Sequence, residues 1–303
     1  MSDLFYLFSN NISPIFLAAG AGFLVAKYLG VSARAVSRIA FYIFSPCLIF
    51  VLLTSGKLNG DDITQMAAFA AASVLLMGLI TALIARLLRF ERSIMVALVI
   101  TVMFGNAGNF GLSLNLFAFG ESAVAHASIF FVTSAFLVYT LGVVLASWGT
   151  SDLKTALIGV FKVPVIYAVI FALIYNGFGW KLPLPVDRTV NLLSEAAIPV
   201  MIVLLGIQLH NAKISRDIFK VGLSNFLRLV ASPVLAIGLA SLFRLEGAAY
   251  QAGVIESAVP TAVLTTVLAT EYDLDPAFVT TTVVTSTLLS PLTLTPLLAF
   301  LGA

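Results

Sequence analysis

The chain has 303 residues, of which 60% are hydrophobic and only 10% are charged, and its net charge is +2. Its mean hydropathy is +1.09. A soluble domain carries about 25% charged residues, so the composition excludes a water-soluble enzyme, a nucleic-acid-binding protein and a disordered regulator. One transmembrane helix needs about 20 apolar residues, and with short loops each crossing uses about 30. The length therefore predicts a polytopic membrane protein with about ten spans.

Long apolar runs separated by short polar breaks indicate the positions of the expected helices. Helical structure is expected because backbone exposed to lipid must satisfy its hydrogen bonds within its own segment. The expected fold class is an all-α membrane protein with ten transmembrane helices. We place them at 11–29, 36–54, 63–88, 93–118, 122–148, 156–176, 189–209, 217–243, 248–270 and 276–301.

Positive charges gather in alternate loops, and cytoplasmic loops carry an excess of Lys and Arg. The odd-numbered loops contain eleven of these residues and the even-numbered loops four, with Arg228 left inside a span. We therefore expect the odd loops in the cytoplasm, both termini outside it, and a location in the plasma (inner) membrane. The eleven are Lys27, Arg34, Arg38, Arg86, Arg89, Arg92, Lys154, Lys162, Lys213, Arg216 and Lys220, and the four are Lys57, Lys181, Arg188 and Arg244.

The chain contains a weak internal repeat. The sequence Arg-Phe-Glu at 89–91 precedes the fourth span, and Arg-Leu-Glu at 244–246 precedes the ninth span, 155 residues later. We therefore divide the chain into five-helix repeats at 1–148 and 156–303, joined by a short cytoplasmic linker at 149–155. Because five is odd, the second repeat enters the membrane from the opposite side, an arrangement that recurs in secondary transporters.

Two spans contain segments that are poor material for a continuous helix. In the fourth span, residues 105–111 read GNAGNFG, with three glycines and two amides. At the matching place in the ninth span, Pro260 lacks a backbone donor and clashes with the carbonyl of Glu256. We expect both helices to be interrupted near the middle of the membrane, at 105–109 and at 259–261.

Each break predicts a binding site with two chemically different ends. The downstream half-helix starts with free N–H groups that favour an anion, and Asn109 and Thr261 are the expected N-cap residues. The upstream half-helix ends in free carbonyls that favour a cation or a protonated group. Alternatively, the glycines serve only close helix packing. The candidate substrate-binding residues are Asn106, Gly108, Asn109, Val259, Pro260 and Thr261.

The fragments GNAGNFGLSLNLFAFGE and ESAVPTAVLTTVLATEYDLDPAFVTTTVV resemble the two signature regions of the auxin efflux carrier family, which includes plant auxin exporters and bacterial carboxylate permeases. The resemblance implies a scaffold of spans one, two, six and seven and a mobile core in which spans four and nine cross. It also implies a homodimer formed through scaffold helices two and seven. The fold is similar to that of sodium–bile acid symporters, where a glutamate at the place of Glu256 binds sodium.

The chain departs from this family at three places. Many relatives have a proline where this chain has Ser113, and an amide side chain where it has Leu264. Plant exporters have a long loop between the halves, whereas here only 149–155 are expected to connect them. Auxin itself is therefore not the expected substrate.

Ionisable side chains within spans need a reason, because a charge at membrane depth costs at least ~2.5–3.5 kcal/mol. Glu256, with Ser257, is the candidate site for a coupling proton or for Na⁺, and the alternative is a protonated acid with a structural role. Arg228 is expected to extend its guanidinium toward the cytoplasmic interface, or else to balance the charge of a substrate or an acidic neighbour. Weaker candidates for the site are Glu195, Pro46 and Ser113.

These features predict a secondary active transporter of a small organic anion, with a carboxylate as the first choice. It would work by alternating access, as a symporter or an antiporter coupled to H⁺ (the first choice) or Na⁺. The alternative is a channel or a ligand sensor that uses the same crossing-helix site. We expect no enzyme, because HExxH, GxSxG and Walker motifs are absent from the sequence. The expected partners are the substrate and the lipid bilayer, with no cofactor and no nucleic acid.

Overall fold

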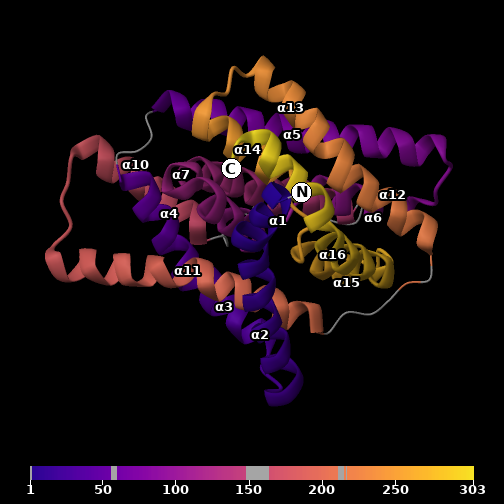
Figure 1. The fold of residues 1–303 in the computed structure, drawn as a ribbon, viewed down its shortest axis with the longest axis horizontal. Helices are drawn as coiled ribbons and strands as arrows, with labels where there is room; N and C mark the ends of the chain where they lie inside the picture. Colours follow the sequence, from indigo (N-terminus) through magenta and orange to yellow (C-terminus); the bar gives the residue numbers. More distant parts are fainter. Residues whose placement is uncertain (1, 56–59, 148–163, 211–214, 216) are drawn as a thin grey trace.

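The computed structural model describes residues 2–55, 60–147, 164–210, 215 and 217–303, which are almost entirely helical (Figure 1). Within these ranges the β-structure is limited to one isolated bridge. Seven of the described helices are long and apolar enough to cross a membrane. The chain is therefore an all-α, multi-pass integral membrane protein, as its composition predicts.

The α-helices of both halves and the π-helical turns between them account for nearly all of the described residues. The first half contains α1 (Ser2–Leu7), α2 (Ser13–Leu29), α3 (Ala33–Ile39), α4 (Ser45–Thr54), α5 (Gly60–Leu87), α6 (Arg92–Met103), α7 (Leu112–Leu137) and α8 (Val143–Ser147). The second half contains α10 (Pro164–Phe178), α11 (Leu184–His210), α12 (Ile218–Phe226), α13 (Ser232–Leu242), α14 (Gly247–Ala258), α15 (Leu264–Glu271) and α16 (Pro276–Leu301). The π-helical turns are η1 (Phe8–Ile12), η2 (Ala40–Phe44), η3 (Ala107–Gly111), η4 (Val138–Gly142) and η5 (Leu227–Ala231).

Both expected helix breaks are confirmed. Helix α6 ends at Met103 and the chain is helical again from Ala107, whereas α14 ends at Ala258 and α15 begins at Leu264. The first break is shorter than expected, because 107–109 already belong to the downstream helix. Inside α7, Gly120 with φ +76° separates the fourth expected span from the fifth. The expected linker 149–155 lies outside the described residues.

Three of the π-helical turns lie next to Ser-Pro pairs. The turns η1, η2 and η5 each end one residue before such a pair, whose prolines are Pro14, Pro46 and Pro233. Proline has no N–H to donate to the preceding turn, and a locally widened turn accommodates that missing bond without ending the helix. The η5 turn also carries Arg228, which lies in the protein interior.

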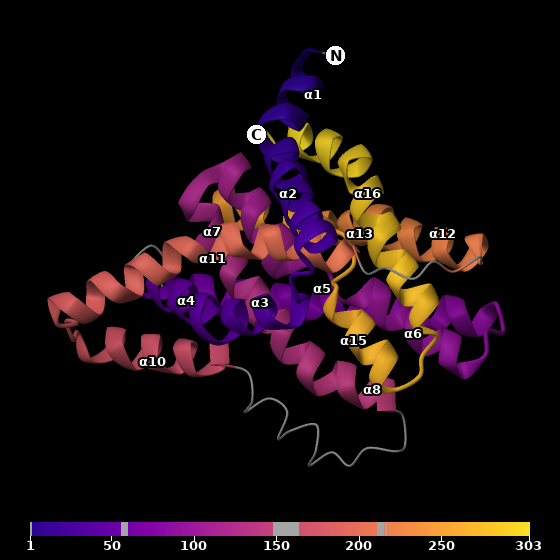
Figure 2. The ribbon, with the colours of Figure 1, turned by 90° about the horizontal axis from the view of Figure 1, so that it is seen from below.

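The contacts between helices divide them into two groups, whose members are labelled in Figures 1 and 2. The scaffold group comprises α2, α3, α4, α10 and α11, in which α11 packs on α2 and α4, and α10 packs on α4. The core group comprises α5, α6, α7 and α12–α16, in which α14 packs on α7 and α5. The first break touches both groups, because η3 contacts α11 of the scaffold group and α14 of the core group.

The scaffold group contains a close helix contact built on glycine. A side chain at Gly22 of α2 would collide with the backbone of Val203, and one at Gly206 of α11 would collide with the backbone of Ala19. Small residues allow helix backbones to approach in this way in membranes, where close packing and hydrogen bonds drive association. This close contact holds α2 and α11 together within the scaffold group.

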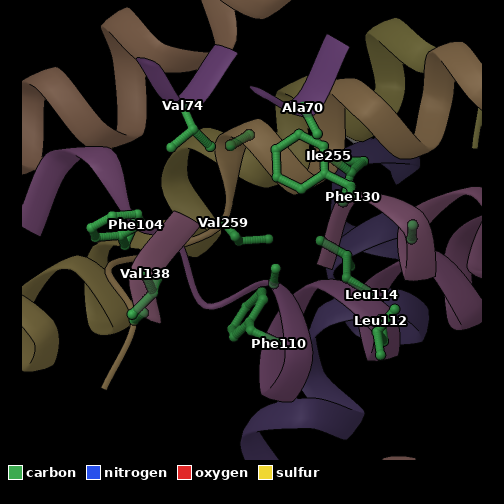
Figure 3. Close-up of a cluster of buried hydrophobic side chains, with 14 of the residues drawn as sticks. Ala70, Val74, Phe104, Phe110, Leu112, Leu114, Phe130, Val138, Ile255 and Val259 are labelled. Atoms are coloured by element: carbon green, nitrogen blue, oxygen red, sulfur yellow. The ribbon is translucent and has the colours of Figure 1, made fainter. Parts of the chain in front are cut away.

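Apolar side chains surround the two breaks (Figure 3). Phe104 and Phe110 flank the first break and Val259 begins the second, and all three are fully buried. They belong to the same hydrophobic core as Val74 of α5 and Phe130 of α7. Water is thereby kept from this side of the breaks, so the polar backbone there must find partners within the protein.

Candidate substrate and ion site at the crossing of the broken helices

The two broken helices are joined directly through their interrupted backbone. Gly105 and Thr261 form an antiparallel bridge. The N–H of Asn106 donates to the carbonyl of Pro260 at 2.7 Å, and the N–H of Ala262 donates to the carbonyl of Phe104 at 2.9 Å. Each interrupted segment therefore provides hydrogen-bond partners for backbone groups of the other, although the two segments lie about half the chain apart in the sequence.

Arg228 occupies the carbonyl end of this crossing. Its Nε donates to the carbonyl of Val259 at 2.7 Å, its Nη1 to Val102 at 3.1 Å and its Nη2 to Glu256 at 3.3 Å. The side chain is only 3% exposed, so the expected extension toward the cytoplasmic interface is wrong. The guanidinium is held inside because the last carbonyls of α6 and α14 lack helical partners and a fork of N–H donors fits them.

The first glycine of the first break makes room for that guanidinium. A side chain at Gly105 would collide with the terminal nitrogen of Arg228. The glycine is thus required by a close approach between backbone and side chain. Gly105 lies within the expected break, but a glycine is needed there because the side chain of Arg228, from another helical segment, occupies the space that a side chain at 105 would take.

At the amide end of the crossing, no described side chain pairs with the free backbone groups. The N–H groups of Ala107, Gly108 and Asn109, and those of Val263 and Leu264, have no hydrogen-bond acceptor among the described residues. These five residues line one cavity of about 210 Å³ between the crossing and the scaffold group. Two half-helix N-termini therefore present free donors to the same space, an arrangement that favours an anion.

Side chains complete the walls of this crossing cavity. Asn106 is only 6% exposed, and its Nδ2 has no acceptor. The scaffold group contributes Ser45, Met201 and Gln208, and the buried Oε1 of Gln208 has no partner among the described residues. Phe41 of η2 adds apolar surface. Sequence reasoning missed Ser45 and Gln208, although a glutamine within an otherwise apolar span was a usable signal.

The structure divides the predicted substrate-binding residues into two sets. Asn106, Gly108 and Asn109 line the crossing cavity. The remaining three, Val259, Pro260 and Thr261, are buried beside it and do not line it, and the cavity is lined instead by residues 262–264. Their polar atoms are occupied: the Val259 and Pro260 carbonyls accept the bonds described above, and the Thr261 hydroxyl donates to Thr101 at 2.9 Å.

The two N-cap predictions are wrong. Asn109 lies inside η3, where Asn106 holds the N-cap position, and Val263 rather than Thr261 precedes α15. Neither N-cap side chain accepts a hydrogen bond from its helix. The backbone bridge determines where each helix resumes, and it leaves the first amides uncapped.

Glu256 lies at the other side of the break and is completely buried. Its Oε1 accepts a hydrogen bond from Asn115 Nδ2 at 3.1 Å, whereas its Oε2 and the Oδ1 of Asn115 have no partner among the described residues. A side chain at Gly111 would collide with the carboxyl group, so this glycine also permits a close approach. Ser257, the expected companion, instead donates its hydroxyl to Gly253 in its own helix at 2.9 Å.

The weaker candidates lie outside the crossing cavity. Ser113 is buried and donates to the carbonyl of Asn109 at 3.2 Å. Pro46 is next to Ser45, which does line the cavity, whereas Glu195 is exposed on α11 and lines none of the described cavities. Their proposed roles remain predictions.

Comparison with known proteins agrees with this architecture. A family model described as membrane transport protein matches residues 7–156 and 149–298. The chain is 28% identical to a transporter from Methanothermobacter thermautotrophicus over 88% of this chain and 89% of the relative. It is also 28% identical to a "Putative malonate transporter" of Rhizobium meliloti, over 95% of this chain and 93% of that protein.

A plant relative links the chain to the resemblance seen in its signature regions. Auxin efflux carrier component 8 of Arabidopsis thaliana is 26% identical over 48% of this chain and 39% of the carrier. The resemblance to auxin efflux carriers is thus confirmed, and the relatives point to transport rather than to catalysis. The chain belongs to the membrane transport protein family that includes the auxin efflux carriers.

Proposed function

We propose that this transporter is a secondary carrier of a small organic anion, a carboxylate, which binds in the crossing cavity. The observation that supports this most strongly is that five backbone amides without an acceptor among the described residues, those of Ala107–Asn109 and Val263–Leu264, belong to residues that line one cavity. Backbone N–H groups at helix N-termini are well suited to a carboxylate. The apolar walls, such as Phe41 and Met201, suit the carbon skeleton.

The transport cycle follows from the two helix groups. The core group rocks against the scaffold group and exposes the crossing cavity to each side of the membrane in turn, with ten spans arranged as two inverted halves. The antiparallel pairing of Gly105 with Thr261 supports the inversion, because these residues are separated by nearly the repeat offset. By the distribution of Lys and Arg, the odd loops face the cytoplasm of a plasma membrane. A homodimer forms through the second and seventh spans, as the family resemblance implies.

Coupling to a cation involves Glu256. The unpaired Oε2 of Glu256 and the unpaired Oδ1 of Asn115 are two oxygen atoms that a proton or Na⁺ would satisfy. Binding of a cation would neutralise the carboxylate and lower the cost of moving the loaded core through the membrane. A proton remains the first choice, because Ser257 uses its hydroxyl within its own helix and Arg228 already binds the nearby carbonyls.

Counterflow in proteoliposomes tests the proposal. Purified protein is reconstituted with unlabelled malonate inside, and labelled malonate is added outside with propionate as a comparison. We expect saturable, transient accumulation of label above equilibrium, which a carrier produces by exchange. Passive equilibration would indicate a channel, and binding without movement of label would indicate a sensor. If no carboxylate is exchanged or bound, the assignment of the crossing cavity to organic anions is wrong.

A further inference from the structure

A second and larger cavity adjoins the crossing cavity. It measures about 670 Å³ and lies between α3, the end of α11, α15 and α16. The two cavities share four lining residues, Ser37, Gln208, Val263 and Val267. The two cavities therefore adjoin between scaffold and core, from the crossing to helix α3, and we refer to them together as the cleft.

Two arginines line the larger, outer cavity of this cleft. Arg34 and Arg38 are four residues apart on α3, so they lie on one face of the helix. Both are exposed, and neither forms an ion pair with a described residue. Among the described residues that line the outer cavity, none is acidic. Asp275 neighbours the lining residue Pro276, but its carboxylate accepts the Phe278 N–H as an N-cap.

The positions of these charges have a chemical consequence. Arginine presents planar donors that match a carboxylate, and a cleft lined by positive charge raises the local concentration of anions. The inner end of the same cleft offers uncharged backbone donors and the unpaired Nδ2 of Asn106. An anion with one acid group can use the inner donors alone, whereas a second acid group adds an interaction with the outer arginines.

We propose that Arg34 and Arg38 form an entrance subsite for acid groups, which makes the cleft selective for organic anions that carry two or more negative charges. The inference rests on the proposed function, since it assumes that the crossing cavity binds a carboxylate. It adds a preference for dicarboxylates over monocarboxylates and assigns that preference to two residues outside the broken helices.

The test compares two three-carbon acids that differ in charge. The Kd values for malonate and propionate are measured by titration calorimetry of the purified full-length protein, at low and at high salt. The variants are R34Q/R38Q, the charge-retaining R34K/R38K, and R89Q as a control that removes an exposed arginine outside both cavities. Because the substituted arginines are exposed, the variants should fold, and unfolding curves in detergent check this.

We expect wild-type protein to bind malonate more tightly than propionate, with a preference that falls at high salt. R34Q/R38Q should weaken malonate binding by roughly three- to tenfold and change propionate binding much less, while R89Q stays near wild type. R34K/R38K keeps the charge but loses the planar donors, so its malonate affinity should lie between those of wild type and R34Q/R38Q. If R34Q/R38Q weakens both acids equally or neither, or if wild type prefers propionate, the entrance subsite is wrong and the crossing site stands. If wild type binds no carboxylate, both proposals fail.

Discussion

At the carbonyl end of the crossing, the buried Arg228 donates to the carbonyls of Val102, Val259 and Glu256. At the amide end, the described residues offer no acceptor to five backbone donors, whose residues line a cavity. At one end of the interrupted backbone the carbonyls bind a side chain of the protein itself, that of Arg228. At the other end the N–H groups are available to a ligand. The comparison suggests that the carbonyl end fixes the crossing and the amide end serves binding, so substitutions at the two ends should have different effects.

The largest effect is expected from Arg228→Met. The substitution leaves three buried carbonyls without donors and should lower the free energy of unfolding by roughly 3–5 kcal/mol. Denaturant unfolding in detergent measures this loss. Arg188→Met, which removes an exposed arginine from α11, is the control and should be nearly neutral. Equal stability of Arg228→Met and the control would mean that the carbonyl end is held by other contacts.

Gly105→Ala tests the same end from the backbone side. The added methyl group collides with the guanidinium of Arg228, and the resulting shift should cost roughly 1–3 kcal/mol of stability. Gly238→Ala in α13 is the matched control, since a side chain there meets nothing within 4 Å, and alanine is the better helix former. A Gly105→Ala protein as stable as wild type would contradict the close approach.

Glu256→Gln separates coupling from binding. The amide mimics the neutral carboxyl group, so it should remove a coupling of about 1–3 kcal/mol between the cation and the anion while preserving the fold. The measurement is the Kd for malonate against pH and against Na⁺ concentration. Glu246→Gln, which changes an exposed carboxylate just before α14, should keep the dependence of the wild type. If Glu256→Gln also keeps it undiminished, the carboxyl group has a structural role.

The smallest effect in free energy is expected from Asn106→Leu at the amide end. The variant loses a polar contact to the anion, so affinity should fall by roughly 1–2 kcal/mol, or about 5- to 30-fold. Stability should be unchanged or higher, because the unpaired buried Nδ2 is removed. Affinity and unfolding are measured on the same preparation. A loss of stability with unchanged affinity would reverse the roles that we assign to the two ends.

The sequence was sufficient to locate the breaks, because glycine, asparagine and proline carry their backbone preferences wherever they occur. It was also sufficient to predict free N–H groups at one end of each break and free carbonyls at the other, since these follow from helix polarity. It was not sufficient to show that the positively charged group at the carbonyl end is the guanidinium of Arg228. Arg228 reaches Val102 from 126 positions away, and no local pattern reveals such a contact.

The partner of Glu256 and the first residues of the two downstream helices were predicted wrongly for the same reason. Asn115 meets Glu256 across 141 positions, so the neighbouring Ser257 was the only partner that local spacing could suggest. The helix starts near Asn109 and Thr261 were misplaced because the bridge between Gly105 and Thr261 sets them. These errors all concern contacts between the two halves of the chain, which local sequence cannot specify.

The bridge at the crossing also has a consequence for biosynthesis. The N–H of Asn106 and the carbonyl of Phe104 find their partners in residues that the ribosome adds roughly 150 positions later. Chains are made from the N-terminus at about 5–20 residues per second, so for several seconds the first half holds an interrupted helix with its backbone unpaired. Unpaired backbone is not tolerated against lipid. The first half should therefore remain beside the insertion machinery, or keep residues 104–106 hydrated, until residues 260–262, which follow α14, arrive to pair with it.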